Sequence, residues 1–342
     1  MPRKKGKHRA PKSSTSWNPF IGCPQPFVST GCERCYVYRV MAGTRFNPRI
    51  LTPTKGLDAT STIDAAPPLH WRRPEMIFTC SLSDFFHQDG DPWRSQAWEV
   101  IRRTPYHRYH ILTKRISRVL SNPEKCLPPD WDTEWNRAYS HVWLGVTVET
   151  AQFYWRLDIL NRIKTTLRWV SCEPLLAPLP DLKKHGLGST VTWCFTGGES
   201  DRYDPRPKGG VPQDWFLDIR DQCHDAKVPF HFLQQGGSKA CRCGCNSKYG
   251  CRRLSGVWYQ QYPVPSLIVE GPKKGKRQRE HILDLLKKNN VPAYKTPVQT
   301  EATRGIPKQT DRILLTDTIS DQTLRNLKKA LPNTIVTLET WS

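Results

Sequence analysis

Six short apolar segments, separated by helix-like stretches, constrain the fold of this 342-residue chain more than any other feature. They are Met76–Cys80, Tyr109–Thr113, Val142–Thr147, Arg168–Cys172, Val191–Thr196 and Pro229–Leu233. Helical patterns between them include Trp93–Arg103, Ala151–Ile163 and Gln213–Ala226. Buried strands that alternate with helices are typical of a parallel sheet. With one more strand expected before residue 23, the pattern predicts an α/β fold, a partial or complete TIM-like (β/α) barrel, with an open doubly wound sheet as the alternative.

The pattern restarts near the C-terminus. Three further strands are predicted at Ser266–Val269, Arg312–Thr316 and Thr334–Leu338, with helices at Gln278–Asn289 and Asp321–Ala330. We therefore predict four parts. They are a flexible basic arm at 1–14, the barrel at 15–233, a Cys-rich metal-binding connector at 234–263 and a small three-stranded α/β domain at 264–342.

Polar residues follow the predicted barrel strands at the point where each strand ends. They are Ser81, Ser83, Asp84, Lys114, Arg115, Thr147, Glu149, Glu173 and Glu199. The carboxyl ends of parallel barrel strands meet at one rim, where ligands bind. A single such group is explained by a helix cap or a rim ion pair. Five groups at one rim favour a binding site.

Three cysteines, Cys23, Cys32 and Cys35, lie close together near the N-terminus. Three thiolates can hold three irons of a [4Fe–4S] cluster and leave the fourth iron open to a small molecule. The alternatives are a structural zinc site that borrows a ligand such as His8, or three unlinked thiols. The N-terminus is basic and has no apolar stretch after it, so no secretory signal is expected. Twelve cysteines then indicate a reducing, cytoplasmic setting, with metal or catalytic roles for thiols.

Ordered runs of residues resemble one known family. They begin with Trp17-Asn18-Pro19, Gly22-Cys23 and Gly31-Cys32-Glu33-Arg34-Cys35-Tyr36, and continue through Ser81-Leu82-Ser83-Asp84-Phe85-Phe86-His87, Leu112-Thr113-Lys114-Arg115, Gly145-Val146-Thr147-Val148-Glu149, Glu173-Pro174-Leu175-Leu176 and Gly197-Gly198-Glu199-Ser200. Over residues of about 15–263, the chain resembles a phage-type three-cysteine family of uncharacterised, radical S-adenosylmethionine-like proteins. The resemblance implies a partial TIM barrel, a [4Fe–4S] cluster on the three cysteines and bound S-adenosylmethionine. It implies no particular substrate.

Residue roles follow from this implied chemistry. Ser83 and Asp84 are candidates for the methionine ammonium, and Lys114 or Arg115 for its carboxylate or a substrate phosphate. Glu149 is expected to accept hydrogen bonds from the ribose. The remaining candidates for cofactor or substrate contacts are Tyr36, Ser81, Thr147, Glu173 and Glu199. One departure concerns spacing: radical S-adenosylmethionine enzymes mostly have CxxxCxxC, whereas eight residues separate Cys23 from Cys32 here. Where an aromatic residue often precedes the last cysteine, this chain has Arg34, with Tyr36 just after it.

The net charge of +21 predicts a polyanionic partner, because released counterions drive such binding. The candidate contacts with nucleic acid, DNA or RNA, are Arg3, Lys4, Lys5, Lys7, Arg9, Lys12, Lys114 and Arg115. General solubility is the alternative explanation of the charge. No run of about 18 apolar residues occurs, so we expect no membrane span. The other expected partners are an electron donor and, through the C-terminal domain, a protein.

A second cysteine group comprises Cys241, Cys243, Cys245 and Cys251. Four thiols within eleven residues predict a zinc site, a second iron–sulfur cluster or neither, and we favour zinc. Our leading hypothesis is a radical S-adenosylmethionine enzyme that modifies bases or repairs lesions in nucleic acid. One alternative is a zinc-stabilised nucleic-acid-binding protein without catalysis. Another is radical chemistry on a protein or a small metabolite.

Overall fold

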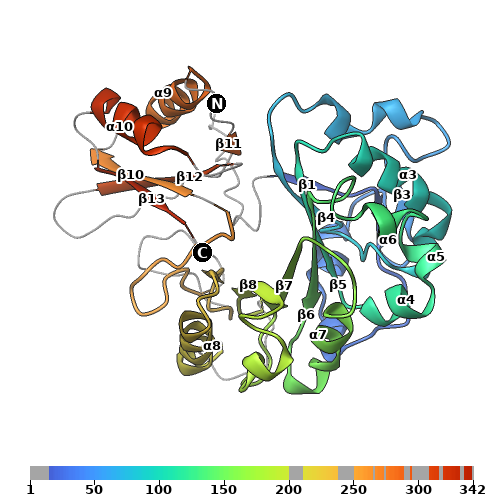
Figure 1. The fold of residues 1–342 in the computed structure, drawn as a ribbon. Coiled ribbons are helices and arrows are strands. Elements are labelled where there is room, and N and C mark those ends of the chain that lie inside the picture. Colours follow the sequence, from blue (N-terminus) through green and yellow to red (C-terminus); the bar gives the residue numbers. More distant parts are fainter. Residues whose placement is uncertain are drawn as a thin grey trace, which may run out of the picture.

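The computed structural model describes residues 15–199, 211–237, 250–264, 266–272, 275–288, 293–294, 308–315, 319–331 and 335–340. Its larger part is a curved sheet of seven strands, all parallel (Figure 1). The strands are β1 (Thr15–Trp17), β4 (Met76–Thr79), β5 (Arg108–Thr113), β6 (Val142–Thr147), β7 (Leu167–Cys172), β8 (Val191–Thr196) and β9 (Phe230–Phe232). All six predicted segments, and the strand expected before residue 23, are present.

The strands lie side by side in chain order, β1-β4-β5-β6-β7-β8-β9. This order excludes the doubly wound alternative, because that arrangement reverses the strand order at a switch point. Within the sheet of the described residues, β1 and β9 are the two edges and do not pair with each other. The fold is therefore a mixed α/β fold with a partial barrel, and the complete barrel that we also considered is wrong.

Helices cover one face of this sheet. They are α3 (Asp91–Arg102), α4 (Ile116–Ser121), α5 (Pro123–Cys126), α6 (Trp131–Glu134), α7 (Trp155–Leu160) and α8 (Gln213–Asp225), with short 3₁₀ turns η1 (Ile63–Ala65), η2 (Pro67–His70), η3 (Gln88–Gly90), η4 (Ala151–Phe153) and η5 (Leu182–His185). Alternate strand residues such as Leu144 and Val146 join the helices in the largest buried cluster. The cysteine region contributes α1 (Thr30–Glu33), α2 (Tyr36–Met41) and a small antiparallel pair, β2 (Phe20–Ile21) with β3 (Thr52–Pro53).

The opposite face of the sheet is aromatic. Trp143, Trp169 and Trp193 belong to a second buried cluster, which Tyr262 completes from outside the strands. Gly145 shows how tightly this face is packed, since a Cβ atom there would lie 2.3 Å from the Trp169 ring. Side chains therefore fill the middle of this face.

Two buried histidines make the stability of this barrel sensitive to acid. Burial lowers the pKa of His110 to about 3 and that of His141 to about 4. An unfolded histidine has a pKa of about 6.5. At a pH between this value and the pKa in the folded protein, the unfolded chain binds a proton that the folded chain excludes, so the free energy of unfolding falls as the pH falls. We expect His110→Phe, measured by urea unfolding from pH 7.5 to 4.5, to flatten the loss of stability on acidification by up to about 1.4 kcal/mol per pH unit.

The matched control for this change is His224→Phe, because the His224 side chain is 89 % exposed. It should leave the pH dependence as in the wild type. An unchanged slope in His110→Phe would contradict the prediction, provided that this variant stays folded at pH 7.5. The Phe ring preserves the stacking that His110 makes with Trp143, whose ring centroid lies 4.8 Å away.

A smaller sheet forms the C-terminal part, in the order β11-β12-β10-β13 and antiparallel throughout. Its strands are β10 (Ser266–Pro272), β11 (Ala293–Tyr294), β12 (Lys308–Leu315) and β13 (Ile335–Glu339). The sheet has four strands and not the expected three, because β11 has two residues and leaves no pattern in the sequence. Helices α9 (Gly275–Lys288) and α10 (Asp321–Ala330) lie on the same face of this sheet (Figure 1). Among the described residues, no helix combines the length and the apolar character needed to cross a membrane.

Candidate functional site

A cavity lies at the carboxyl ends of the barrel strands, where the polar groups were predicted to meet. It encloses about 1080 Å³ of empty space, its open mouth included. Twelve predicted site residues line it, and ten of them are Cys23, Cys32, Cys35, Tyr36, Ser81, Ser83, Asp84, Thr147, Glu173 and Glu199. Lys114 and Arg115 line it as well, whereas Glu149 does not. The strand ends and the cysteine loop therefore form one site.

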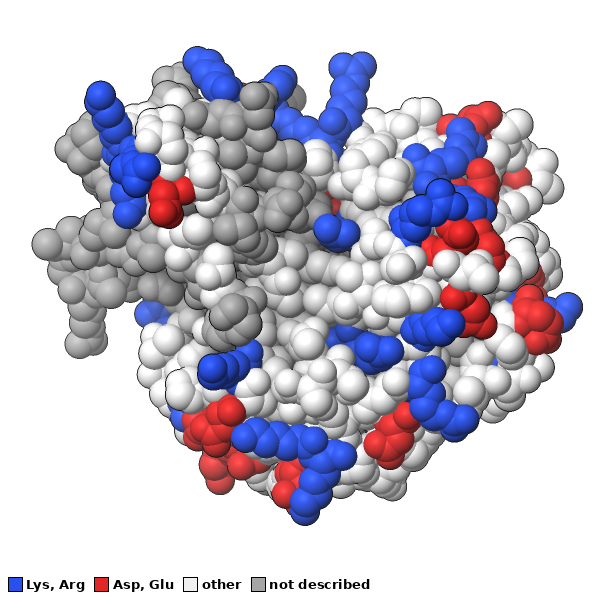
Figure 2. All heavy atoms as spheres, in the orientation of Figure 1, with Lys and Arg blue, Asp and Glu red and all other residues white. Residues whose placement is uncertain are grey.

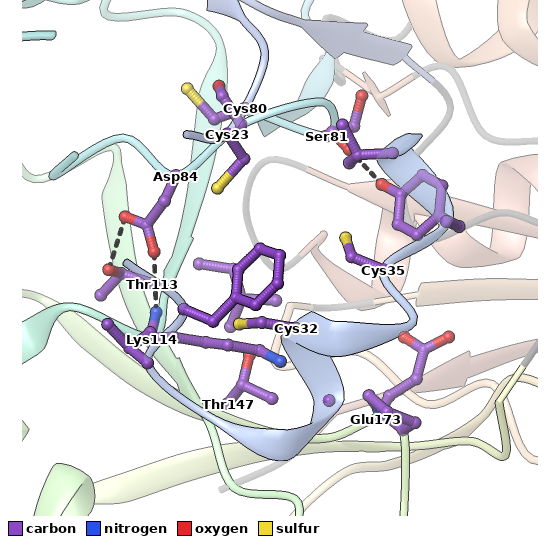
Figure 3. Close-up of a pocket in the computed structure, with 18 of the residues that line it drawn as sticks. Cys23, Cys32, Cys35, Cys80, Ser81, Asp84, Thr113, Lys114, Thr147 and Glu173 are labelled. Carbon is purple, nitrogen blue, oxygen red and sulfur yellow. Dashed lines mark hydrogen bonds between the residues drawn. The ribbon is translucent and has the colours of Figure 1, made fainter. Parts of the chain in front are cut away.

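The three predicted cysteines face the same space. Figure 3 shows the sulfurs of Cys23, Cys32 and Cys35 directed into the cavity from three sides. Cys80 also lines the cavity, but its sulfur points away from the other three (Figure 3). The arrangement therefore distinguishes three thiols from a fourth that is close in space.

Three buried side chains hold the long loop between Cys23 and Cys32 against the barrel. Each donates to one carbonyl oxygen, and the three carbonyls belong to alternate residues of the loop. His87 Nε2 donates to Pro24 (3.1 Å), Arg115 Nη2 to Pro26 (2.8 Å) and Arg156 Nη2 to Val28 (2.9 Å). His87 can donate from Nε2 because its Nδ1 accepts the Asp89 backbone N–H. Burial, and then the nearby Arg115, lower the pKa of His87, so the ring is neutral near pH 7. The loop is thus fixed to the barrel by residues that follow β4, β5 and β6 in the chain.

Glu149 is the centre of a buried ion network that holds the same loop. Its Oε2 accepts from Arg156 at 2.8 Å, and both side chains are 0 % exposed. Its Oε1 accepts from the Lys114 ammonium and, at 2.6 Å, from the Ser29 hydroxyl. Burial alone would lower the pKa of Lys114, but Glu149 and then Cys32 raise it above its ordinary value. Glu149 therefore links the loop to β6 and is not placed to bind a ribose in the cavity.

Gly31 lets the first turn of α1 approach this network closely. A Cβ atom at Gly31 would lie 2.8 Å from the Glu149 Oε1 and 3.0 Å from the Lys114 Nζ. Ser29, two residues earlier, brings its hydroxyl within 3.4 Å of the Cys32 sulfur. The position of Cys32 thus depends directly on the buried ion network.

The Asp84 carboxylate also accepts hydrogen bonds from neighbouring parts of the barrel. Its Oδ1 accepts from the Thr113 hydroxyl at 2.7 Å, and its Oδ2 accepts from the Lys114 backbone N–H at 2.9 Å (Figure 3). The Phe86 N–H is a third donor, at 3.0 Å. Asp84 therefore joins the ends of β4 and β5, and its capacity to accept a methionine ammonium as well is reduced.

The other predicted contacts are placed as follows. The Ser83 hydroxyl donates to the Phe20 carbonyl at 2.9 Å, and Ser81 exchanges hydrogen bonds with Asn18. The Tyr36 hydroxyl donates to the Ser81 carbonyl, while Tyr36 keeps 39 % of its surface exposed. The carboxylate of Glu173 projects from the end of β7 at the cavity wall (Figure 3). These residues lie together, although most of the short polar side chains are engaged with the framework.

The residues predicted to contact nucleic acid are placed as follows. Lys114 and Arg115 were expected to reach phosphates, but Lys114 is paired with Glu149 and Arg115 is buried on the Pro26 carbonyl. The predicted contacts of the basic arm lie outside the described residues: Arg3, Lys4, Lys5, Lys7, Arg9 and Lys12. Three cysteines of the second group also lie outside them: Cys241, Cys243 and Cys245. Cys251 is described, and its sulfur accepts the Arg253 backbone N–H at 3.3 Å.

Several residues of the site were missed in the sequence. Arg156 and Ser29 carried no visible signal, because neither stands in a recognisable motif. Asn18 and His87 do stand in the quoted runs, but their role was not apparent. Asn18 fixes the chain after β4 by accepting the Leu82 N–H at 2.8 Å. Asn18, His87 and Arg156 position the rim or the loop through backbone groups, and Ser29 does so through Glu149, which the sequence does not reveal.

Cys23 is expected to be unreactive in the folded, iron-free protein. Burial, and then the charge of Asp84, raise the pKa of its thiol to about 12. At pH 8 its thiolate fraction is then on the order of a thousandfold below that of a free cysteine. We predict that iodoacetamide labels Cys23 at least about 100-fold more slowly in the folded than in the urea-unfolded protein, as measured by peptide mass spectrometry.

Asp84→Asn should speed this labelling, because it removes the second cause of the raised pKa. Asp64→Asn is the matched control, since Asp64 lies on the surface, paired with Arg103. Equal labelling rates in the folded and unfolded protein would contradict the prediction. A metal bound to Cys23 must displace the thiol proton, so loading of the site should improve as the pH rises.

The three cysteines are donors of the type that an iron–sulfur cluster takes. A cubane binds its thiolates at separate irons, so its ligands surround a space and do not converge on one atom. The three thiols surround such a space here. Among the residues that the structure describes, no group of three or more His, Cys, Asp or Glu side chains is placed to hold a metal ion.

Residues 11–263 match the model of a family described as a protein of unknown function (DUF5131). The match covers most of the chain, and the chain therefore belongs to this family. A comparison with curated proteins finds no match.

Proposed function

We propose that this member of the DUF5131 family is a radical S-adenosylmethionine enzyme that acts on nucleic acid, as a base-modifying or lesion-repair enzyme. One observation carries the proposal: three thiols of one short segment, residues 23–35, face one cavity at the carboxyl ends of a partial parallel barrel. Three thiolates leave one iron of a [4Fe–4S] cluster without a protein ligand. An open position of this kind favours chemistry over a purely structural role.

A [4Fe–4S] cluster with bound S-adenosylmethionine would supply one-electron, radical-based removal of hydrogen from a substrate. Cys23, Cys32 and Cys35 would hold the cluster. The residues around them contribute position and environment, in keeping with the division of labour in cofactor enzymes. Phe27, Val28, Phe78 and Leu112 line the cavity and limit the access of water and stray hydrogen donors.

The carboxylates of the cavity wall define where a cationic cofactor group is favoured. Asp84 accepts three hydrogen bonds from the framework. Glu173 and Glu199 also line the cavity, at the ends of β7 and β8. Together these three carboxylates would give the cavity wall a negative charge that favours the amino and sulfonium groups of the cofactor. Opposite charges at short range in a partly buried site favour such contacts.

The net charge of +21 supports nucleic acid as the substrate. Figure 2 shows that the charge is unevenly spread on one face of the molecule. Basic and acidic side chains are mixed along its lower and right margins, whereas several basic ones at the top centre have no acidic neighbour among the residues that the structure describes. If the target base lies in a duplex, it must leave the stack to reach the cavity, which costs a few kcal/mol.

Metal analysis after anaerobic purification tests the class of enzyme. We expect roughly four irons and four sulfides per chain, and release of 5′-deoxyadenosine from S-adenosylmethionine when dithionite serves as the electron donor. A protein that holds zinc alone, even after anaerobic reconstitution with iron and sulfide, would support the zinc-stabilised binding protein instead. Zinc in addition to the four irons would assign the second cysteine group to zinc, as we favour.

A further inference from the structure

The chain beside the cysteine cavity forms an exposed, strongly basic surface. We call residues 25–50 the rim segment; it spans α1, α2 and the loop that follows. It contains four arginines, Arg34, Arg39, Arg45 and Arg49, all exposed, and a single carboxylate, that of Glu33. Arg34, Arg45 and Arg49 form no ion pair with any residue that the structure describes. Some exposed arginines elsewhere on the barrel differ: Arg102 and Arg103 each pair with an aspartate.

Exposed aromatic rings accompany these charges. Phe27 is 37 % exposed and Tyr36 is 39 % exposed, although both rings also line the cavity. Phe27 packs edge-on against Tyr38, with ring centroids 5.8 Å apart, and this contact helps to hold the Phe27 ring in place. Arg34 lies between the two rings in the chain and lines the cavity as well. The rim segment is therefore continuous with the cavity.

We propose that the rim segment binds a single-stranded or locally unpaired nucleic acid, with Arg45 and Arg49 on the backbone phosphates and Phe27 or Tyr36 stacked on the base that enters the cavity. The inference rests on the proposed function, whose substrate it deepens. Arginine-rich grooves with aromatic platforms are the common means of binding unpaired strands. Arginine also matches phosphate in geometry.

An acidic protein, such as a reduced electron carrier, is the other partner that a basic surface near a cluster would attract. The position of the rings favours the nucleic acid. Arg34, Phe27 and Tyr36 line the cavity itself, so a partner that covers them closes the entrance through which the substrate must pass. The substrate is the partner that has to engage these residues.

The test is fluorescence anisotropy with a fluorescein-labelled single-stranded oligonucleotide of about 20 nucleotides, titrated with the full-length protein at several salt concentrations. We expect Arg45→Gln/Arg49→Gln to reduce the slope of log affinity against log salt by about 1.4, because each phosphate contact on a single strand contributes about 0.7. The same relation predicts a loss of about 25-fold in affinity at 0.1 M salt. Lys183→Gln/Lys184→Gln is the matched control, because these exposed lysines lie in η5, before the amino end of β8.

Phe27→Leu tests the stacking separately, because leucine keeps an apolar side chain against Tyr38 but offers no ring. We expect about tenfold weaker binding with an unchanged salt slope, and recovery in Phe27→Trp. Equal binding by Arg45→Gln/Arg49→Gln and its control would overturn the proposal. So would unchanged oligonucleotide binding together with weakened binding of a reduced acidic flavoprotein.

Uncoupled release of 5′-deoxyadenosine distinguishes this inference from the proposed function. The double arginine variant should retain it, since neither arginine lines the cavity. If the protein releases 5′-deoxyadenosine but the arginine substitutions leave oligonucleotide binding unchanged, only the proposed binding role of the rim segment is refuted. Rim-dependent binding without any release would refute the radical chemistry and leave a nucleic-acid-binding surface.

Discussion

Cys32→Ala is expected to lower the iron content from about four per chain to less than one, and to abolish release of 5′-deoxyadenosine from S-adenosylmethionine. The physical reason is that two remaining thiolates leave two irons of a cubane without protein ligands, and such a cluster is readily lost. The structure adds a reason specific to Cys32, whose sulfur lies 3.4 Å from the Ser29 hydroxyl in the buried ion network. Iron and sulfide assays on anaerobically reconstituted protein give the measurement.

The matched control is Cys80→Ala. Cys80 lines the same cavity, but its sulfur is directed away from the three proposed ligands (Figure 3). This variant should bind iron and cleave the cofactor as the wild type does. If Cys80→Ala lost iron while Cys32→Ala kept it, the assignment of the ligands would be wrong. Circular dichroism on both variants separates loss of metal from loss of fold.

The second large effect is expected from Glu149→Gln, which should lower the free energy of unfolding by about 3–5 kcal/mol. The substitution leaves the Arg156 guanidinium and the Lys114 ammonium in a buried site without their common carboxylate. An unpaired buried charge is far more costly than the loss of an exposed ion pair. For a domain of this size we expect the melting temperature to fall by roughly 10 °C.

Glu134→Gln is the control for this loss, because Glu134 pairs with Arg137, whose side chain is 81 % exposed. It should change the stability by less than about 1 kcal/mol. A combined replacement, Lys114→Met with Glu149→Leu and Arg156→Met, should recover part of the stability lost in Glu149→Gln, because it leaves no buried charge. Equal stability of Glu149→Gln and the wild type would show that the network contributes little to folding.

The barrel was predictable from the sequence because its strands are buried on both faces. Segments such as Val142–Thr147 are then apolar throughout, and the polar residues that follow mark their ends. Strands of two residues gave no comparable signal, which is why β2, β3 and β11 went unpredicted. The openness of the barrel was also beyond the sequence, since it depends on whether β1 and β9 meet in space.

The location of the site was predictable from the sequence, but the hydrogen-bond and ion-pair partners of its charged residues were not. Residue type and place at a strand end brought Asp84, Lys114 and Glu173 to one cavity. Whether a carboxylate faces the cavity or the framework depends on donors from distant parts of the chain. Glu149 was assigned to a ribose because nothing in the sequence connects it with Arg156 or with Ser29. The sequence analysis predicted nucleic-acid contacts in the basic arm and not at the rim arginines, because these arginines are separated from one another in the sequence and form no basic run.

The hydrogen bonds from His87, Arg115 and Arg156 to every second carbonyl of the loop explain how an unusually wide first cysteine gap is tolerated. A slack loop of eight residues would lose conformational entropy each time that it closed on a metal. Here that ordering occurs when the barrel folds, so the metal meets a preorganised shell. The extra length between the first two cysteines therefore anchors the ligands, and apo and loaded protein should share one loop conformation.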